Sequence, residues 1–176
     1  GSAEPEVLEA SGLVLENYQE ALRRFPYQTL SKTNRLTYDI LQLYLQNQLS
    51  GQKFALYAEP LGPTIGTQAQ LPVLLAEYAF RNKADIETYL TLLTEMDEYY
   101  STLVHFEEAK SREGLFMSAS AAQAVIDQCN AFIREPSKNF LITVFAEKIE
   151  EADFLTQVEK KHFLEQNEKA VLEHVI

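Results

Sequence analysis

Apolar residues recur three or four positions apart along most of this chain, and this spacing constrains the fold more than any other feature. Such a period places the apolar side chains on one face of an α-helix. The chain contains only 6 glycines and 6 prolines, too few for the many turns of an all-β fold, and no strand-like alternation is sustained. We therefore predict an all-α fold, an antiparallel multi-helix bundle of about six to seven helices with one long ordered loop.

Capping residues indicate where the helices begin and end. Side chains that can accept a hydrogen bond from a free backbone N–H at a helix start belong to Ser31, Asn82, Ser118 and Thr156, the last within a capping box. Residues that can end a helix are Pro26, Gly51, Gly114 and Pro136. These signals predict a longest helix from Asn82 to Gly114. Its wide apolar face, which includes Tyr100, Leu103 and Phe106, is assigned to the core.

The stretch from residue 52 to residue 72 shows no helical period. It is rich in turn-forming residues, namely Pro60, Gly62, Pro63, Gly66 and Pro72. Loops of this length are uncommon in compact domains unless they are functional or disordered. Because apolar residues are interspersed through the stretch, we expect an ordered, packed loop, followed by a short helix over residues 72–80.

The charge balance excludes several classes of function. The chain has 15 Lys and Arg against 26 Asp and Glu, a formal net charge of −11. We do not expect a nucleic-acid partner, because phosphate binding requires clustered basic side chains.

No apolar run approaches the roughly 20 residues of a membrane span. The single cysteine, Cys129, excludes an internal disulfide and a cysteine-based zinc site, and its apolar neighbours predict a small buried side chain.

The two ends of the chain suggest a piece cut from a longer protein. Residues 1–2, Gly-Ser, resemble a purification-tag remnant, which leaves residues 3–176 as a single helical domain or a fragment of a larger helical protein. The last helix has no Gly or Pro stop signal and ends on apolar residues. We therefore expect exposed apolar surface, and self-association through it, at Tyr57, Phe80, Val171, Val175 and Ile176.

Most motifs for catalysis and metal binding are missing from the sequence. One large group of zinc peptidases carries two histidines four residues apart with a Glu between them, and His105, His162 and His174 form no such pair. Glu159 and His162 make a single Glu-x-x-His pair, whereas a di-iron bundle needs two on different helices. His162 could therefore be a metal ligand, or it could simply lie on a solvated face of its helix. We expect no catalytic residue, metal ligand or cofactor in this chain alone.

Polar residues embedded among apolar ones are the candidate functional residues of this sequence. They are Gln68, Gln70, Glu77, Tyr78 and Arg81. Polar groups that become buried must be paired. These side chains therefore either fix the backbone of the loop or line a binding pocket, and the sequence leaves both interpretations open.

Three blocks of sequence carry a resemblance to a known family. They read LPVLLAEYAFR at residues 71–81, DIETYL at residues 85–90 and KSREGLFMS at residues 110–118. From about Ser31 onward, the chain resembles a bacterial family of uncharacterised proteins, domain of unknown function 885. Members of that family are several times longer and carry a His-Glu-x-x-His-type motif downstream, which implies a mostly helical zinc metallopeptidase. No position of this chain matches that motif, so the resemblance transfers no catalytic residue.

Two functional hypotheses follow from this resemblance and from the composition. In the first, the chain is the non-catalytic helical N-terminal region of a zinc metallohydrolase. It would act as a scaffold and as part of the substrate cleft, with the remainder of its own longer chain as partner, a peptide as substrate and zinc bound only in the longer protein. The resemblance also suggests an extracytoplasmic location. In the alternative, the chain is a self-standing module that binds a peptide or partner helix in a hydrophobic groove.

Overall fold

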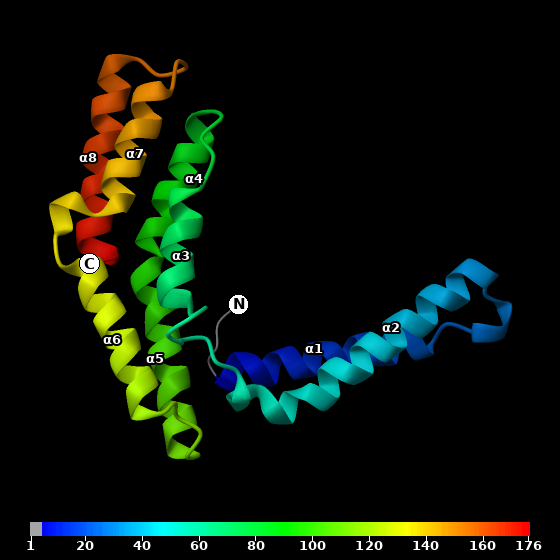
Figure 1. Cartoon of the computed structure of the whole chain (residues 1–176). Coiled ribbons are helices and arrows are strands. Elements are labelled where there is room, and N and C mark those ends of the chain that lie inside the picture. The colour runs from blue at the N-terminus through cyan, green and yellow to red at the C-terminus, as the bar shows by residue number, and fades with distance from the viewer. Residues whose placement is uncertain (1–4) are drawn as a thin grey trace. The chain divides into compact units, whose positions relative to one another are not determined.

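Helices make up most of the structure, a computed structural model that describes residues 5–176 and the side chains from Ser11 onward. The two-residue tag remnant predicted at the N-terminus lies outside the described residues. The α-helices are α1 (Pro5–Arg23), α2 (Lys32–Gly51), α3 (Thr67–Ala76), α4 (Lys83–Thr94), α5 (Met96–Arg112), α6 (Ala119–Ile133), α7 (Phe140–Glu151) and α8 (Gln157–His174) (Figure 1). Three short 3-10 helices are η1 (Tyr27–Thr29), η2 (Gln52–Tyr57) and η3 (Pro136–Lys138). No strand occurs among residues 5–176, so the predicted all-α class is confirmed.

Local capping signals define the predicted helix starts. The side chains of Ser31, Asn82, Ser118 and Thr156 each accept a hydrogen bond from the backbone N–H three residues further on. Thr156 also completes a reciprocal capping box. After α5, Gly114 has a φ of +71°, the left-handed conformation that glycine adopts without steric penalty. The caps predicted from sequence at these five positions are confirmed.

The region around residues 51–72 differs from its prediction. Gly51 has a φ of −75° and stays helical, so the chain passes directly from α2 into η2 instead of ending in a left-handed cap. Pro72 lies inside α3, which begins at Thr67 and ends at Ala76. The predicted loop over residues 52–72 is therefore helical at both ends, and only residues 58–66 connect η2 to α3. The predicted longest helix is likewise interrupted, at Glu95, which separates α4 from α5.

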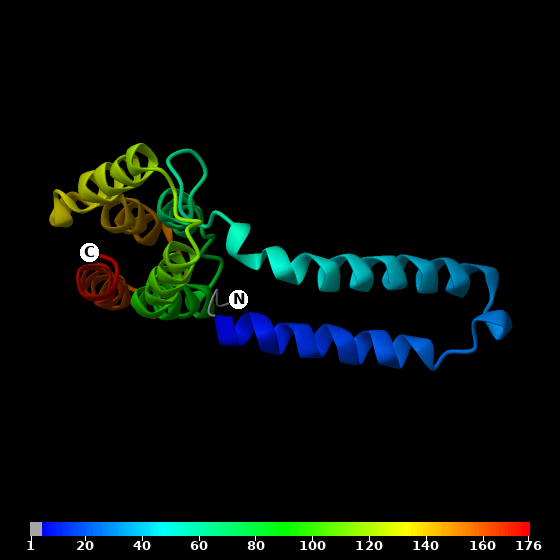
Figure 2. The same cartoon turned by 90° about the horizontal axis from the view of Figure 1, so that it is seen from below.

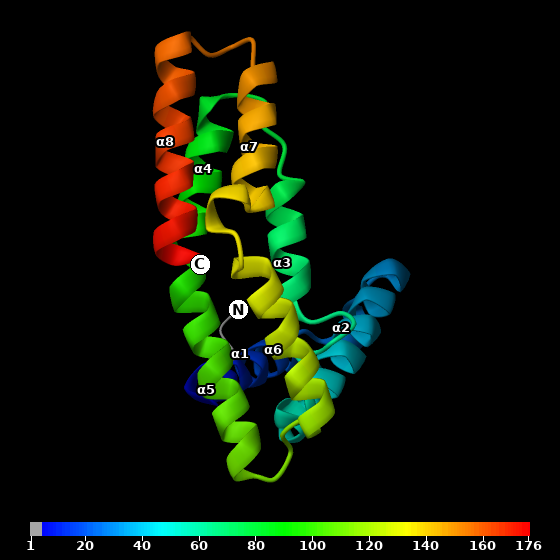
Figure 3. The ribbon, with the colours of Figure 1, turned by 60° about the vertical axis from the view of Figure 1, so that its left-hand side comes forward.

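The chain divides into two compact units. The second unit comprises Glu59–Ser101 and Met117–Ile176, and its core is one cluster of buried side chains. In this unit α8 packs against α4 and α7, while α3 packs against α6 and α7 (Figure 3). Side chains with almost no exposure include Ile86, Leu93, Leu141, Ile149 and Val171. Tyr100, assigned to the core from sequence, is partly buried against this cluster.

The first unit comprises the residues up to Ala58 together with Thr102–Phe116. Its largest feature is a helical hairpin in which α1 and α2 run antiparallel and pack together (Figure 2). Leu103 and Phe106 of α5 are buried, as predicted. The Lys110 ammonium is fully buried and donates a 2.7 Å hydrogen bond to the Ala58 carbonyl oxygen.

The prediction of exposed apolar surface is wrong at four of its five positions. Of the five candidates, Tyr57 alone is exposed. Val171 is fully buried in the core, and Val175 and Ile176 pack partly against it. Phe80 is partly buried, with its ring 5.3 Å from the rings of Tyr89 and Phe145. The final turn of α8, a helix that packs against α4 and α7, therefore contributes to the core.

Candidate functional site

Gln68, at the start of α3, connects the loop of residues 58–66 to α6. Its side-chain NH₂ group donates to the Gly62 carbonyl oxygen at 2.7 Å and to the side-chain oxygen of Gln128 at 2.8 Å. Gln128 in turn donates to the Pro63 carbonyl oxygen at 2.7 Å. The two amide side chains thus connect the backbone of the loop to α6 through the Gly62 and Pro63 carbonyl oxygens. Gln68 was a predicted candidate, whereas Gln128 was missed, because no local pattern marks it.

Close packing of the loop depends on Gly66. A Cβ atom at this position would lie 2.3 Å from the Gly62 backbone nitrogen and 2.5 Å from its oxygen. Only glycine permits such an approach without moving the backbone. The Gly66 N–H donates to the Gly62 carbonyl oxygen at 3.2 Å. The loop is therefore a tight, specific turn.

A cavity of about 160 Å³ lies beside this turn, within the second unit. Its walls come from α3, α5, α6 and the end of α8. Its lining residues are Gln68, Pro72, Met96, Tyr100, Cys129, Phe132, Ile133 and Val175. Most of these side chains are apolar. The polar ones already have partners, since Tyr100 donates to the Thr67 carbonyl oxygen at 3.3 Å and Gln68 is bonded as described above.

Burial shapes the electrostatics of this cavity. Burial raises the pKa of Tyr100 to about 12, with a smaller contribution from Cys129. Partial burial of the sulfur at the rim of the cavity also raises the pKa of the Cys129 thiol. Both groups are therefore neutral at pH 7, and a neutral thiol is a poor nucleophile. The arrangement suits binding of an apolar group rather than covalent chemistry.

Cys129 is exposed, in contrast to the predicted buried side chain. Its apolar neighbours in sequence, Val125 and Phe132, turn toward the protein interior, since Val125 is buried and Phe132 packs on the core. By helical spacing Cys129 shares that face, four residues after Val125, but it reaches the cavity only from its rim. Helical spacing alone could not separate these two positions.

The remaining predicted site residues do not join Gln68. Gln70 is exposed on α3, and Glu77 is exposed just after the last turn of that helix. Tyr78 packs against Phe80 and Tyr89. Arg81 is exposed, and its backbone N–H donates to the Asp85 carboxylate at 2.9 Å. Two of the five candidates thus lie near the start of α3 and three lie after its end, and of the five only Gln68 lines the cavity.

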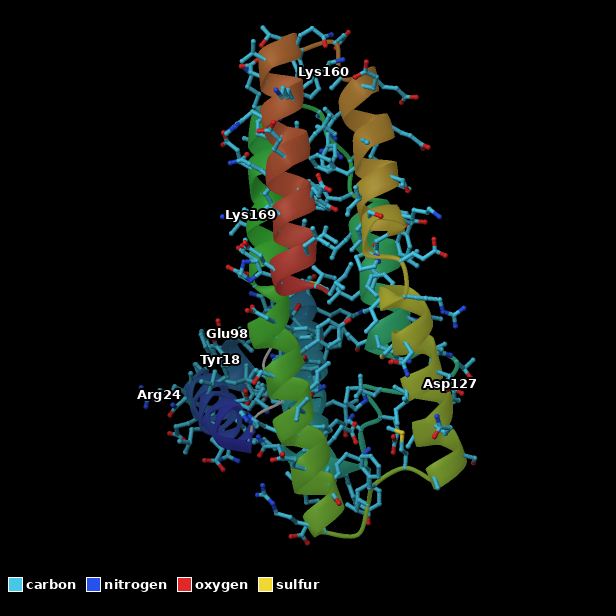
Figure 4. All side chains as sticks on the ribbon, turned by 90° about the vertical axis from the view of Figure 1, so that its left-hand side faces the viewer. Tyr18, Arg24, Glu98, Asp127, Lys160 and Lys169 are labelled. Carbon is cyan, nitrogen blue, oxygen red and sulfur yellow. The ribbon has the colours of Figure 1, made fainter. Side chains whose placement is uncertain are left out.

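A second, larger hollow of about 420 Å³ lies between α4 and α8. Most of its lining residues are polar or charged, and they carry both signs of charge, including Glu87, Lys169, Glu173 and His174. Figure 4 labels Lys169 on α8. The Lys169 ammonium already lies 3.9 Å from the Glu173 carboxylate, and His174 Nδ1 lies 3.3 Å from Asp97 Oδ2. Exposed ion pairs of this kind are solvated and contribute little interaction energy. The apolar cavity beside Gln68 is therefore the better candidate site.

Two absences complete the description of residues 5–176. In that part of the chain, no three His, Cys, Asp or Glu side chains gather where they could hold a metal ion. None of its described helices combines the length and the apolar composition of a membrane-spanning helix.

Comparison with known sequences identifies the family. The model of a bacterial protein of unknown function, DUF885, matches residues 2–176. The chain belongs to the DUF885 family. The match includes residues 2–30, which the three sequence blocks did not cover. No protein with a curated description matches this chain.

Comparison with solved structures supports the same architecture for this DUF885 chain. It is similar to a crystal structure described as "the putative lipoprotein from Colwellia psychrerythraea", with a TM-score of 0.84 and 16% sequence identity. The similarity covers 99% of this chain and 32% of the Colwellia chain, so this chain spans about a third of that protein's length. At this identity the likeness shows the fold alone.

Proposed function

We propose that this chain is a non-catalytic helical scaffold region of a longer DUF885 protein and forms one wall of a substrate cleft. The observation that carries the proposal is the fold likeness, because nearly the whole chain corresponds to only 32% of the Colwellia protein. A region of that size would leave the chemistry to the rest of a longer chain. The family resemblance implies that this chemistry is peptide hydrolysis by zinc.

The apolar cavity supports a role in substrate binding. Its volume of about 160 Å³ is close to the roughly 150 Å³ that holds one benzene ring in an engineered protein cavity. The polar groups on its walls already have partners, so an apolar side chain of a peptide would fit it better than a polar one. Met96 and Phe132 would contact such a side chain.

The residues that the structure describes do not fit a zinc site. No suitable cluster of ligands occurs in the described part of the sequence, and His162 is exposed on α8. Any zinc of the longer protein would therefore be held by residues outside this sequence. An extracytoplasmic location is part of the proposal, and the description of the Colwellia protein as a lipoprotein supports it.

A second candidate function is a self-standing module that binds a partner helix. The observation that favours it is the exposed apolar stripe on α2, where Leu36, Ile40 and Leu43 are all exposed. Helix-in-groove recognition uses apolar residues at this spacing.

Metal and activity analysis separates the two functions. We would purify this chain and a version extended past Ile176 by its own reading frame. We expect no stoichiometric zinc or peptidase activity in this chain, and both in the extended protein. A reading frame that stops near Ile176 would favour the interaction module. Stoichiometric zinc in this chain, lost on His162→Ala, would contradict the scaffold proposal.

A further inference from the structure

The walls of the apolar cavity beside Gln68 are rich in sulfur and aromatic groups. The whole chain has one cysteine and two methionines, and Cys129 and Met96 both line this cavity. The Phe132 side chain lines it as well. Polarizable sulfur atoms and aromatic rings make contacts with a bound ring that are more favourable than their contacts with an aliphatic group of the same size. These walls therefore favour an aromatic ring as the ligand.

The same walls are unsuited to a charged ligand. Among the described residues that line the cavity, none carries a formal charge at pH 7. The Tyr100 hydroxyl donates to the Thr67 carbonyl oxygen, and the Gln68 NH₂ group is bonded to Gly62 and Gln128. A charged or strongly polar ligand would lose its hydration here without gaining equivalent partners. The chemistry of the cavity thus points to an unsubstituted phenyl ring.

Met96 lies between this cavity and a second apolar hollow. The second hollow has a volume of about 240 Å³ and also belongs to the second unit. Its lining residues are Leu71, Leu75, Leu92, Glu95, Met96 and Tyr99. Met96 is common to both linings, and its side chain is only 3% exposed. The buried methionine side chain is therefore the partition that ends the first cavity on this side.

We propose that the cavity beside Gln68 is a specificity pocket for a phenyl ring, the side chain of a phenylalanine residue in a peptide substrate, and that Met96 sets its upper size limit. A volume of about 160 Å³ suits one ring. A two-ring side chain would have to displace Met96. The peptide rests on the proposed function, whereas ring binding is a property of this chain alone.

Nuclear magnetic resonance of this chain tests ring binding, with N-acetyl amino-acid amides as the probes. The two methionine methyl groups are the reporters, because Met96 lines the cavity and Met117 does not. The phenylalanine amide should shift the Met96 methyl resonance saturably through its ring current and leave Met117 unchanged. We expect a dissociation constant of about 1–10 mM, since a single ring has few atoms to contribute. The cyclohexylalanine amide has nearly the same size but no aromatic ring, and it should bind at least about fivefold more weakly.

Substitutions at Met96 test the size limit. The readout is protection of the Cys129 thiol from iodoacetamide, and wild type should bind the phenylalanine amide at least about tenfold more tightly than the 2-naphthylalanine amide. Met96→Ala should remove or reverse this preference, because it opens the cavity toward the second hollow. Met96→Leu conserves the side-chain volume and should keep the wild-type order. If Met96→Ala does not fold, the smaller truncation Met96→Val takes its place.

Leu92→Ala is the matched control for the partition. It enlarges the second hollow, which Leu92 lines, without touching the cavity beside Gln68. The variant should therefore keep the wild-type preference for one ring over two. Loss of that preference in Leu92→Ala as well would show that Met96 is not the partition.

Three other results would overturn the proposal. One is equal binding of the phenylalanine and cyclohexylalanine amides, and another is an equal shift of the Met96 and Met117 methyl resonances. The third is an unchanged preference for one ring over two when Met96 is truncated. The zinc analysis of the extended protein is a separate readout. Zinc and peptidase activity there, without ring binding here, would overturn the phenyl pocket and leave the scaffold function standing.

Discussion

The ammonium nitrogen of Lys148 lies 2.9 Å from the backbone carbonyl oxygen of Tyr78. The same nitrogen donates to the Ala76 carbonyl oxygen, so one side chain of α7 satisfies two carbonyls at the end of α3. It also lies 5.5 Å from the centre of the Phe80 ring. Burial lowers the pKa of Lys148, and Glu77 opposes that effect. A cation at a helix C-terminus is favoured by the helix dipole, which explains why a lysine occupies this position.

Lys148→Met should destabilise the protein. The substitution keeps the apolar stem but leaves the carbonyls of Ala76 and Tyr78 without their donor. We expect a loss of about 1–3 kcal/mol in the free energy of unfolding, measured by urea denaturation. The control is Lys161→Met, on the exposed face of α8, which should change stability by less than about 0.5 kcal/mol. Equal effects of the two variants would contradict the role assigned to Lys148.

Glu159 should make the stability of the protein depend on acid pH. A hydrogen bond from the Lys83 ammonium, followed by hydrogen bonds from the Thr156 backbone and hydroxyl, lowers the pKa of Glu159 from 4.5 to about 2. Because the folded-state pKa lies below the unfolded value, the stabilisation is present above about pH 4.5. It is lost as the pH falls toward 2.

Glu159→Gln tests this pH dependence. The amide can still complete the capping box with Thr156 but loses the charge that Lys83 pairs with. The variant should have a lower Tm than wild type at pH 7, and the difference should shrink progressively between pH 4.5 and pH 2. Glu165→Gln, exposed on the same helix, is the control and should track wild type throughout. A Tm difference that stays constant with pH would rule out the proposed ionisation.

Two adjacent residues of α5 should differ sharply in their contribution to stability. Leu103 is 2% exposed, whereas Val104 is 55% exposed. Leu103→Ala should cost about 2–5 kcal/mol, from lost burial and the cavity left behind. Val104→Ala should cost less than about 0.5 kcal/mol. Denaturant unfolding of the two variants, followed by circular dichroism, provides the comparison, and similar midpoints would mean that the Leu103 face is not buried.

Two glycine substitutions should act in opposite directions. Gly66→Ala forces a Cβ atom against the Gly62 backbone and should lower the Tm and open the loop beside the cavity. Gly51→Ala meets no atom within 4 Å and lies in helical backbone. It should therefore stabilise the protein by about 0.4–1 kcal/mol. Calorimetry of both variants checks the signs, and a stabilising Gly66→Ala would contradict the tight turn.

The single thiol offers a direct probe of the cavity. Since burial raises the pKa of Cys129, alkylation by iodoacetamide at pH 7 should be slower in the native protein than in the urea-denatured chain. If the cavity accepts an aromatic ring, millimolar phenol should slow native alkylation further and leave the denatured rate unchanged. Mass spectrometry follows the single modification. A native rate equal to the denatured rate would show that the thiol is fully solvated.

Much of the local structure could be predicted from the sequence. Caps such as Ser31, Asn82 and Thr156 act on backbone groups three residues away, so their geometry depends on neighbours in the chain and not on the fold. The left-handed turn at Gly114 is similarly local. The wide apolar face that includes Leu103 and Phe106 also indicated the core correctly, because helical spacing alone places those side chains on one side.

The candidate site could be predicted only in part. Gln68 was identified because a polar residue among apolar ones must find a partner. Its partner, Gln128, is 60 residues away on another helix, and no sequence pattern connects the two. The other four predicted residues share the local pattern of Gln68 but lie elsewhere on α3 or beyond it, so the pattern alone did not define a site.

The sequence by itself determined the helical class, the starts of α2, α4, α6 and α8 and the net negative charge, since these depend on side-chain chemistry and spacing within a few residues. Only the tertiary structure decided that Val171 is buried at the end of α8, that Cys129 is exposed and that Pro72 lies within a helix. Burial depends on which distant helix covers a given face. Helical spacing identifies the apolar face of a helix but not the helix that packs against it. The exposed stripe on α2 illustrates the same limit, because the sequence marks it as apolar while only the packing leaves it uncovered.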